Sequence, residues 1–338
     1  MSSRKIEEAM ADTILVLVEQ QQTRLNRVSW ETIVAAQAIA RDTGWRVEVA
    51  VLGSDVGAVA QKLAGANVAK VYAIESPHLA TYTSDAYVYV LKEFLASRQP
   101  KLVLMPHTYQ VRDFAPSLAL GLAKTVIPDV VGYKYESGKL LFTRQMFQGK
   151  FSADVSFTGE GPWMVTFQNA AFRGDQLETG SAPVETIQVT VPDGVIRVQP
   201  HDVFKEAKQS VDLSQSDVIV AVGRGIKDPK NLPMVEELAK LLCGDVAASR
   251  PICDAGWLPL DRQVGSSGQT IAPKLYFALG ISGAIQHIVG MKGSRTIIAI
   301  NKDADAPIFE IADVGAVANL FDVLPPLMDE IKKIKATP

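Results

Sequence analysis

The stretch from Arg250 to Asp313 reads RPICDAGWLPLDRQVGSSGQTIAPKLYFALGISGAIQHIVGMKGSRTIIAINKDADAPIFEIAD. It contains two apolar runs, KLYFAL and TIIAI, and each leads directly into a turn rich in glycine, asparagine or aspartate. Such runs are typical of buried strands in a parallel sheet, whose carboxyl ends meet on one side. Glycines, hydroxyls and amides gathered there suit an anionic ligand of dinucleotide type, because backbone N–H groups and helix N-termini attract phosphate.

The rest of the chain repeats this alternation of strands and helices. In the first half, strand-like runs at 13–20 and 101–107 alternate with helical segments such as 29–44, which begins with serine and ends with glycine. Residues 131–168 are rich in Val, Tyr, Phe and Thr and contain glycine turns, which indicates further strands, mainly antiparallel. The α/β pattern restarts in the second half and predicts a final helix from about Val314 to Lys335.

These patterns predict an α/β protein with two doubly wound, mainly parallel-sheet domains, the first with an added antiparallel β segment. Residues 175–210 carry charge, glycine and proline without a long periodic pattern. We therefore place the linker near residues 192–212. The expected domains are residues 1–205 and residues 206–338.

The composition is that of a soluble globular protein, with 338 residues, 47% hydrophobic residues, 21% charged residues and a formal net charge of −3. This charge gives no reason to expect a nucleic-acid partner, and no apolar run approaches the roughly 20 residues that a membrane helix needs. The segment before Thr13 lacks the apolar core of a signal peptide. Cys243 and Cys253 match no disulfide or metal-binding pattern, and we expect small buried side chains there. We expect a reducing compartment, namely the cytoplasm of a bacterium or archaeon, or the mitochondrial matrix of a eukaryote, although no transit peptide is seen.

Three loops of the second domain each allow a ligand-binding and a purely structural interpretation. Residues 223–225, GRG, follow an apolar strand and either bring backbone and charge to a phosphate or form a turn with a solvated arginine. Residues 249–251, SRP, fix an arginine at a strand end, where it holds charge over a ring or phosphate or makes a surface ion pair. Residues 263–270, QVGSSGQT, form either an anion-binding nest or an ordinary flexible loop.

Residues 280–287, GISGAIQH, give the strongest local signal. A strand runs into a glycine turn, Ser282 is expected to cap the next helix, and His287 faces the same crevice or packs as an ordinary helical histidine. Asn301, Lys302, Asp303 and Asp313 follow the next strand, where they either contact a ribose or phosphate or form a polar turn.

All these loops follow strands of one sheet, so their polar groups are expected to converge on one nucleotide-type site. GxSxG, HExxH, Walker A and paired-carboxylate patterns are missing from the sequence. Hydrolysis and phosphoryl transfer are therefore not indicated. A donor-lined crevice of this kind fits a redox cofactor that carries its own chemistry.

The order of these segments closely resembles the electron-transfer flavoprotein alpha subunit over about residues 217–335. The segments that carry the resemblance are GRG at 223–225, SRP at 249–251, DAGW at 254–257, RQVGSSG at 262–268, GISGAIQH at 280–287, INKD at 300–303 and APIFEIAD at 306–313. The resemblance implies that the second domain binds FAD, and that the first lies at the interface with a beta subunit, which completes the cofactor's surroundings.

The resemblance also implies a set of cofactor-binding residues: Arg224, Ser249, Arg250, Gln263, Val264, Gly265, Ser266, Ser267, Gly268, Gln269, Thr270, Gly280, Ser282, Gly283, Ala284, Ile285, Gln286, His287, Asn301, Lys302, Asp303 and Asp313. Within this set, Arg250 would lie near the isoalloxazine and the Ser267 hydroxyl would reach N5. His287 would approach the C2 carbonyl, and Asn301 with Lys302 would touch the adenosine half. No metal site is expected.

Three positions depart from the family's usual residues. Ser267 stands where many relatives have threonine, which keeps the hydroxyl but loosens its rotamer. Gln269 stands where many have lysine, which removes a positive charge. Asn319, where some relatives have an acid, leaves the adenine end of the site less defined.

The function implied is that of an electron-carrier subunit rather than a stand-alone enzyme, passing electrons between flavin dehydrogenases, such as acyl-CoA dehydrogenases, and a downstream acceptor. One alternative is a subunit of an NADH-oxidising, electron-bifurcating complex, whose second flavin would lie mostly on the partner. The other is a non-redox, nucleotide-binding regulatory module, which would be colourless.

Overall fold

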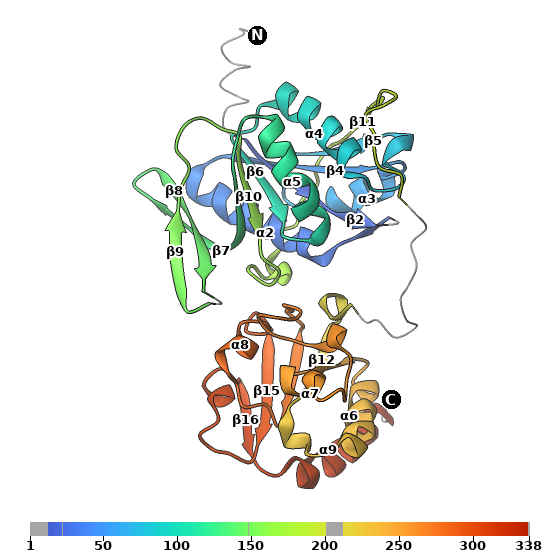
Figure 1. Ribbon diagram of the computed structural model, residues 1–338, viewed down its shortest axis with the longest axis vertical. Coiled ribbons are helices and arrows are strands. Elements are labelled where there is room, and N and C mark those ends of the chain that lie inside the picture. Colours follow the sequence, from blue (N-terminus) through green and yellow to red (C-terminus); the bar gives the residue numbers. More distant parts are fainter. Residues whose placement is uncertain (1–12, 22, 148, 201–211, 337–338) are drawn as a thin grey trace. The chain divides into compact units, whose positions relative to one another are not determined.

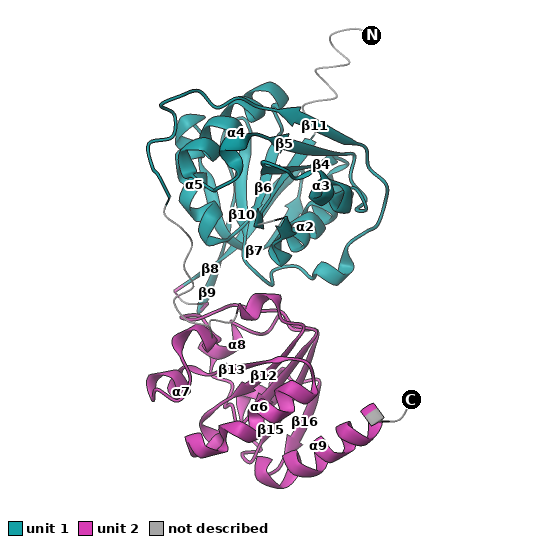
Figure 2. Cartoon of the chain, turned by 90° about the vertical axis from the view of Figure 1, so that its right-hand side faces the viewer, with its two compact units in different colours: residues 1–146, 150–203 teal, residues 147–149, 204–338 magenta. Residues whose placement is uncertain are grey.

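The computed structural model describes residues 13–21, 23–147, 149–200 and 212–336. The chain forms two compact units, unit 1 with residues 1–146 and 150–203, and unit 2 with residues 147–149 and 204–338 (Figure 2). The expected domain boundary at 205/206, and part of the expected linker, fall among residues 201–211, outside the described residues. Each unit has its own sheet and its own apolar core.

Unit 1 is built on a nine-stranded sheet in the order β11-β5-β4-β1-β6-β10-β7-β8-β9. Its strands are β1 (Thr13–Val18), β4 (Arg46–Gly53), β5 (Lys70–Glu75), β6 (Leu102–Pro106), β7 (Val126–Glu136), β8 (Lys139–Met146), β9 (Phe151–Val155), β10 (Trp163–Phe167) and β11 (Val184–Gln188), with a separate small pair, β2 (Gln20–Gln21) and β3 (Arg24–Leu25). Neighbours from β11 to β7 are parallel, whereas β7, β8 and β9 pair antiparallel. The predicted fold class, including the antiparallel segment, is confirmed. One part was wrong, since β10 lies within 131–168 but is parallel to both of its neighbours.

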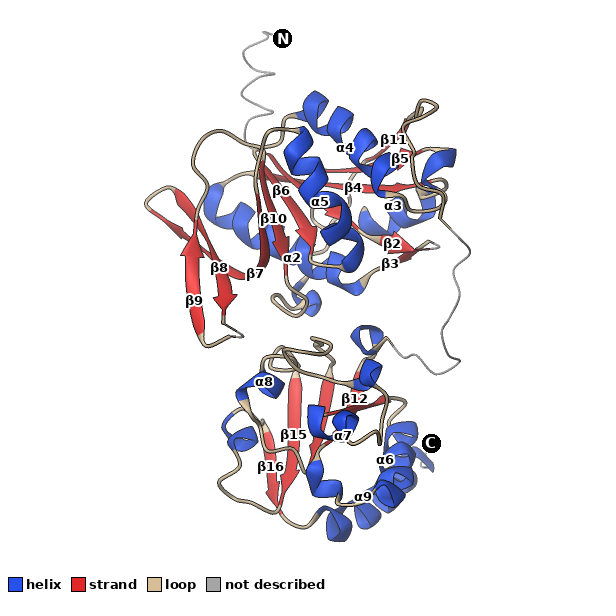
Figure 3. Cartoon of the chain, in the orientation of Figure 1, coloured by secondary structure: helices blue, strands red, loops and turns tan. Residues whose placement is uncertain are grey.

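Helices cover both faces of the parallel part of this sheet (Figures 1 and 3). They are α2 (Arg27–Thr43), α3 (Gly57–Leu63), α4 (Ser84–Arg98) and α5 (Tyr109–Gly121), with short 3-10 turns at Pro77–Leu79 and Gly174–Gln176. Side chains of β1 alternate between two cores: Ile14 packs with Ile33 of α2, and Leu15 packs with Phe114 of α5. Burial on both sides explains why β1 is apolar at every position after Thr13.

The predicted helix at 29–44 starts two residues earlier than the serine suggested. Asn26 caps it, because its side chain accepts a hydrogen bond from the Val28 N–H, while Gly44 ends it in a left-handed conformation as expected. Ser29 is buried instead, and its hydroxyl accepts a hydrogen bond from the Glu19 N–H at 2.9 Å.

Unit 2 is built on a five-stranded parallel sheet in the order β13-β12-β14-β15-β16. Its strands are β12 (Val218–Val222), β13 (Asp245–Ala248), β14 (Leu275–Leu279), β15 (Thr296–Asn301) and β16 (Val314–Val317). Its helices are α6 (Leu232–Leu241), α7 (Arg250–Asp254), α8 (Ile285–Ile288) and α9 (Leu320–Ala336), with 3-10 turns at Leu213–Gln215, Arg224–Ile226, Pro229–Asn231, Leu260–Arg262 and Pro307–Glu310. The strand order runs outward in both directions from the β12–β14 pair, which makes this pair the topological switch point of a doubly wound sheet.

Two local expectations for unit 2 were wrong. The final helix begins at Leu320 rather than near Val314, because residues 314–317 add the edge strand β16 to the sheet beside β15. The cysteines also differ from each other, since Cys253 is buried as expected but Cys243 is exposed, and both are free thiols.

No helix in the described part of the chain has both the length and the apolar composition required to cross a membrane.

Candidate functional site

The loops after β12 and β14 touch each other at the switch point of unit 2. The Gly223 N–H donates to the Leu279 carbonyl at 2.9 Å, and the Gly225 N–H donates to the Gly280 carbonyl at 3.1 Å. A Cβ added at Gly225 would lie 2.5 Å from the Cα of Gly280, closer than real Cβ atoms come to backbone. The two loops can therefore run against each other only because glycines stand on both sides.

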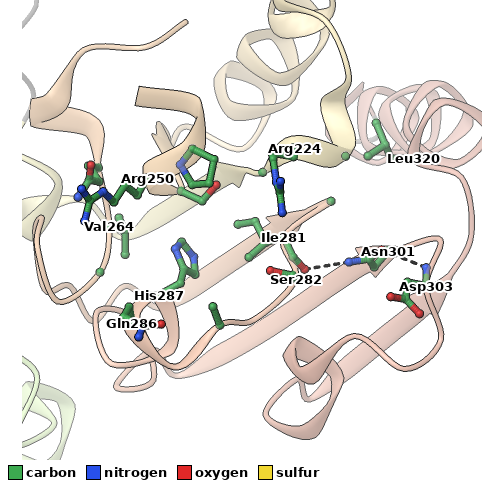
Figure 4. A pocket seen from close by; sticks show the side chains of 18 of the residues that line it. Arg224, Arg250, Val264, Ile281, Ser282, Gln286, His287, Asn301, Asp303 and Leu320 are labelled. Atoms are coloured by element: carbon green, nitrogen blue, oxygen red, sulfur yellow. Dashed lines mark hydrogen bonds between the residues drawn. The ribbon is translucent and has the colours of Figure 1, made fainter. Parts of the chain in front are cut away.

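A cavity of about 700 Å³ opens beside this contact at the carboxyl ends of the strands (Figure 4). This volume lies within the range of small-molecule and cofactor sites. The predicted site residues that line it are Arg224, Ser249, Arg250, Gln263, Val264, Gly265, Ser266, Ser267, Gly280, Ser282, Ala284, Gln286, His287, Asn301, Lys302 and Asp303. The convergence of these loops, argued from their positions after strands, is therefore present in the folded chain.

The remaining predicted residues do not line the cavity: Gly268, Gln269, Thr270, Gly283, Ile285 and Asp313. The side chains of Gln269 and Asp313 have structural partners. The Gln269 side chain donates to the Asp261 carbonyl, and the Asp313 carboxylate accepts from the Ile297 N–H at 2.7 Å. Asp313 thus ties the start of β16 to β15 instead of facing the crevice.

Several lining residues were not in the set of expected cofactor-binding residues: Gly223, Gly225, Lys227, Pro251, Ile281, Ala318, Asn319 and Leu320. Of these, Gly223, Gly225 and Pro251 belong to loops that the sequence had already indicated, and Asn319 was expected near the adenine end. Ala318 to Leu320 follow β16, a strand that was mistaken for helix, so the strand-end rule was never applied there. Lys227 lies in the same turn as Arg224, and its cationic side chain was the signal that could have pointed to it. The cavity wall carries four basic side chains, Arg224, Lys227, Arg250 and Lys302, against the single carboxylate of Asp303.

The basic side chains differ in how they are held. Arg250 begins α7, is largely exposed, and its Nε lies 3.3 Å from the Asp254 carboxylate one turn later. Lys227 lies over the ring of Phe321, 5.4 Å from its centroid. Arg224 and Lys302 make no ion pair within the residues that the structure describes. Arg224 points toward the middle of the cavity (Figure 4).

The loop at 263–268 is folded back on itself. The Gln263 side chain is buried, and its amide Nε2 donates to the Ser267 hydroxyl oxygen at 2.9 Å. The Gln269 N–H donates to the Gln263 carbonyl at 2.7 Å, which closes the loop. Since the Ser267 oxygen accepts this bond, its own hydrogen is left to donate elsewhere.

The loop at 280–287 departs from its predicted form. Ser282 is not a helix cap: α8 is a short helix of four residues, its cap position is Ala284, and no side chain caps it. Gly283 has φ +84°, and a Cβ there would lie 2.2 Å from the Ile308 backbone nitrogen. That nitrogen donates to the Ser282 carbonyl at 3.1 Å. The loop is therefore shaped by backbone packing against residues 307–308 rather than by a long helix.

His287, the third residue of α8, is 7% exposed and its imidazole projects toward the cavity (Figure 4). Its Nε2 lies 2.8 Å from the hydroxyl of Tyr276, a fully buried residue of β14. Burial lowers the pKa of His287 to about 4, and the Val264 backbone opposes this shift only in part. The ring is therefore neutral near pH 7.

Asn301 ends β15 and has both ends of its side chain engaged (Figure 4). Its Nδ2 donates to the Ile281 carbonyl at 2.9 Å, and its Oδ1 accepts from the Asp303 N–H at 3.1 Å. Asn301 therefore joins the loop after β15 to the loop after β14. Lys302, the next residue, also lines the cavity.

Comparison with known proteins settles the family. Residues 14–192 match the model of the electron transfer flavoprotein domain, and residues 212–292 match that of the electron transfer flavoprotein FAD-binding domain. The electron transfer flavoprotein subunit alpha of Thermoanaerobacterium thermosaccharolyticum is 38% identical over 95% of this chain and 98% of its own. The chain belongs to the electron transfer flavoprotein alpha-subunit family.

Other members of the family are similar over nearly the full length. Electron transfer flavoprotein subunit alpha of Bacillus subtilis is 36% identical over 96% of this chain and 99% of its own. A protein named acryloyl-CoA reductase electron transfer subunit beta, from Anaerotignum propionicum, is 34% identical over 95% of this chain and 96% of its own. As a member of this electron transfer flavoprotein family, the chain functions in electron transfer and its cofactor is FAD.

Proposed function

We propose that this chain holds its FAD in the unit 2 cavity, pairs with an electron transfer flavoprotein beta subunit, and passes electrons between flavin dehydrogenases and a further acceptor. The observation that carries the proposal is the cavity at the β12–β14 switch point, lined by 16 of the predicted residues. The relatives' names support the partners, since two of them are designated alpha subunits and a third is named an electron transfer subunit of an acryloyl-CoA reductase. We infer that the flavin dehydrogenases that exchange electrons with this chain act on acyl-CoA thioesters, as acyl-CoA dehydrogenases do.

The residues of the cavity fit FAD chemically. Four basic side chains face one carboxylate, which suits a pyrophosphate. The glycines of the loops after β12 and β14 allow these loops to pack against each other at the edge of the cavity, which they line. In addition, the Nδ1 of His287 is buried without a hydrogen-bond partner among the described residues, and a ligand acceptor would satisfy it.

We assign the phosphate-binding role to the β12, β13 and β14 ends. Arg224 points into the cavity without an ion pair in the described chain, so its charge is available to a phosphate. Ser249 precedes α7, and its hydroxyl makes no capping hydrogen bond to that helix. The backbone N–H groups of Ile281, Ser282 and Ala284, which line the cavity, are the further donors that we infer on the facing side.

We assign the flavin-ring contacts to Arg250, Ser267 and His287. The Ser267 hydroxyl can donate outward because Gln263 already occupies its oxygen. Bound FAD supplies the one- and two-electron redox chemistry, which no side chain can supply. The chain's own contribution is positive charge and N–H or O–H donors in a water-poor crevice, which favour a reduced, negatively charged ring and so raise its reduction potential.

We also infer a cytoplasmic location. Both cysteines are free thiols and one of them is exposed, which is typical of proteins kept in a reducing compartment.

The test is the visible spectrum of the chain co-produced with its beta subunit, followed during anaerobic addition of an acyl-CoA dehydrogenase with its substrate. We expect a flavin spectrum that bleaches as electrons arrive and recovers on adding an acceptor. A colourless complex that does not take up FAD would contradict the proposal. Rapid bleaching by NADH alone would instead favour the electron-bifurcating alternative.

A further inference from the structure

Tyr276 lies behind the cavity, in the apolar core of unit 2. Its side chain is fully buried among residues such as Ile271, Met291 and Ile297. The only hydrogen bond that its hydroxyl makes within the described residues is the one to His287 Nε2, at 2.8 Å. A buried tyrosine hydroxyl needs a partner for its hydrogen, so the nature of this single bond is constrained.

The direction of the bond follows from the surroundings of Tyr276. If Nε2 carried the proton, the tyrosine oxygen would accept the hydrogen bond from it. The phenolic hydrogen would then be left in an apolar core without an acceptor, which is unfavourable. If the tyrosine donates to Nε2, every hydrogen at this contact is used. Burial raises the pKa of the Tyr276 hydroxyl well above its usual value, so the hydroxyl keeps its proton.

A neutral imidazole has one N–H, so an acceptor role for Nε2 places the proton on Nδ1. Nδ1 is buried and makes no hydrogen bond of ordinary geometry among the described residues, and the nearby Val264 backbone only partly offsets the lowering of the ring's pKa. The Nδ1–H group is thus a hydrogen-bond donor that is available to a ligand, on a ring that lines the proposed cofactor cavity.

We propose that Tyr276 is a positioning residue that holds His287 as the neutral Nδ1–H tautomer, so that the ring offers the bound cofactor a hydrogen-bond donor and no base. The inference rests on the proposed placement of FAD. Tyr276 itself does not line the cavity, and it acts only through His287.

The first experiment determines the tautomer directly. The chain has four histidines, His78, His107, His201 and His287, so labelling this chain alone with ¹⁵N-histidine and combining it with unlabelled beta subunit gives few ring signals. The His287 signals are assigned by their loss in His287→Gln. We expect a protonated Nδ1 and an unprotonated Nε2 in the parent, and loss of this preference in Tyr276→Phe. A protonated Nε2 in the parent would overturn the proposal, even if Tyr276→Phe cannot be produced.

The second experiment measures the reduction potential of the bound FAD in a double-mutant cycle. Tyr276→Phe should make the potential more negative in the parent background and leave it unchanged in the His287→Gln background. An equal shift in both backgrounds would mean that Tyr276 only supports the fold. The control is Tyr72→Phe, which removes another buried hydroxyl, bonded to Glu48 at 3.1 Å in unit 1, and should leave the potential unchanged.

The two proposals fail in distinguishable ways. A colourless complex with a protonated Nδ1 would refute the placement of FAD and keep the tautomer. A flavin-bearing complex with a protonated Nε2 would refute the proposed tautomer and leave the proposal that the chain binds FAD intact.

Discussion

The two units have parallel doubly wound sheets, yet the polar groups at their strand ends are used differently. In unit 1, Glu19 follows β1 and accepts hydrogen bonds from the Thr108 hydroxyl and the Asn26 amide. The His107 ring, after β6, lies 2.7 Å from the Thr166 hydroxyl. In unit 2, Arg224 makes no ion pair and His287 Nδ1 makes no hydrogen bond within the described residues.

This difference shows what topology alone does and does not specify. A doubly wound parallel sheet provides a strand-end crevice, and both units have the strand order for it. Whether the crevice is a ligand site depends on whether its polar groups satisfy one another or are left to a ligand. In unit 1, Glu19 and His107 are paired with neighbouring side chains, and the exception is the Ser76 hydroxyl after β5, which is buried without a partner among the described residues. In unit 2, Arg224 and the Nδ1 of His287 are left without an internal partner in the described part of the chain, and both line the cavity.

A substitution at Gly283, in the loop at 280–287 of unit 2, should give the largest effect on stability and FAD binding. Gly283→Ala places a Cβ 2.2 Å from the Ile308 nitrogen at φ +84°, so both backbone strain and a clash with backbone must be relieved. We expect a loss of about 3 kcal/mol or more in the stability of unit 2, together with loss of FAD, measured by denaturant unfolding and flavin absorbance.

Gly256→Ala is the matched control for that change. Gly256 also has positive φ, at +71°, but a Cβ there meets nothing within 4 Å. It should cost only about 1–2 kcal/mol and leave FAD bound. Equal losses in the two variants would show that the Gly283 loop is not specifically packed.

Acid should destabilise unit 2 through His287. The pKa of this residue is about 4 in the folded chain against an ordinary 6.5, because burial disfavours the charged ring. As the pH falls below 6.5, the histidine is protonated in the unfolded chain but stays neutral in the folded chain. The free energy of unfolding therefore declines until about pH 4, by up to about 3 kcal/mol. Calorimetry of FAD-free protein between pH 4 and 7 should show this decline, and His287→Gln should reduce it. His78→Gln, at an exposed histidine, is the control and should leave the decline unchanged. The same decline in His287→Gln as in the parent would contradict the account.

Unit 1 should respond to pH in the opposite direction through Glu31. Burial raises the pKa of this α2 carboxyl to about 7, against a hydrogen bond from the Ala170 N–H and the charge of Arg27. An acid with a raised folded pKa stabilises below its ordinary value of 4.5 and loses that contribution as the pH rises through 7. Glu31→Gln should therefore raise the stability of unit 1 by about 2 kcal/mol at pH 8 and change little at pH 4. The same gain at both pH values would rule out titration as the cause.

Removing charge from the cavity rim should give the smallest effect. Arg250→Gln breaks an exposed pair with Asp254, which contributes little to stability, but it removes a positive charge beside the cofactor. We expect FAD to bind about tenfold more weakly, or about 1.4 kcal/mol, at a more negative potential.

Lys274→Gln is the control for Arg250→Gln. Lys274 makes a similarly exposed ion pair with Asp217, at 2.8 Å. It directly precedes β14, at the end of that strand that lies away from the cavity. FAD titrations at two salt concentrations should separate the two variants. If Arg250→Gln has the same FAD affinity and the same flavin reduction potential as the parent, Arg250 does not contribute to either property.

The sequence predicted the sheet and most of the crevice because both follow from local patterns. Apolar runs such as Val218–Val222 mark buried strands, and the residues after them must gather at one edge. The short strand β16 was missed because VGAV, largely exposed at a sheet edge, lacks the apolar run of a buried strand. The capping role expected for Ser282 failed because Gly283 packs against Ile308, a contact distant in sequence.

Side-chain pairings within the site were also beyond sequence reasoning. The sequence placed His287 at the cavity, but the Tyr276 hydroxyl that holds its Nε2 comes from the preceding strand and faces the core. Likewise, the bond from Gln263 to Ser267 depends on a loop that folds back on itself. Such contacts depend on rotamers and packing, which spacing in the chain does not specify.

The most direct test of the central claim is hydrogen–deuterium exchange of the complex with its beta subunit, with and without FAD. We predict that FAD slows exchange in peptides covering 249–250, 263–268 and 280–287 of unit 2. Peptides at the unit 1 strand ends, around Glu19 and Thr108, should exchange equally in both states because their polar groups are already paired. Protection of the unit 1 strand ends, with none in the unit 2 loops, would contradict the account.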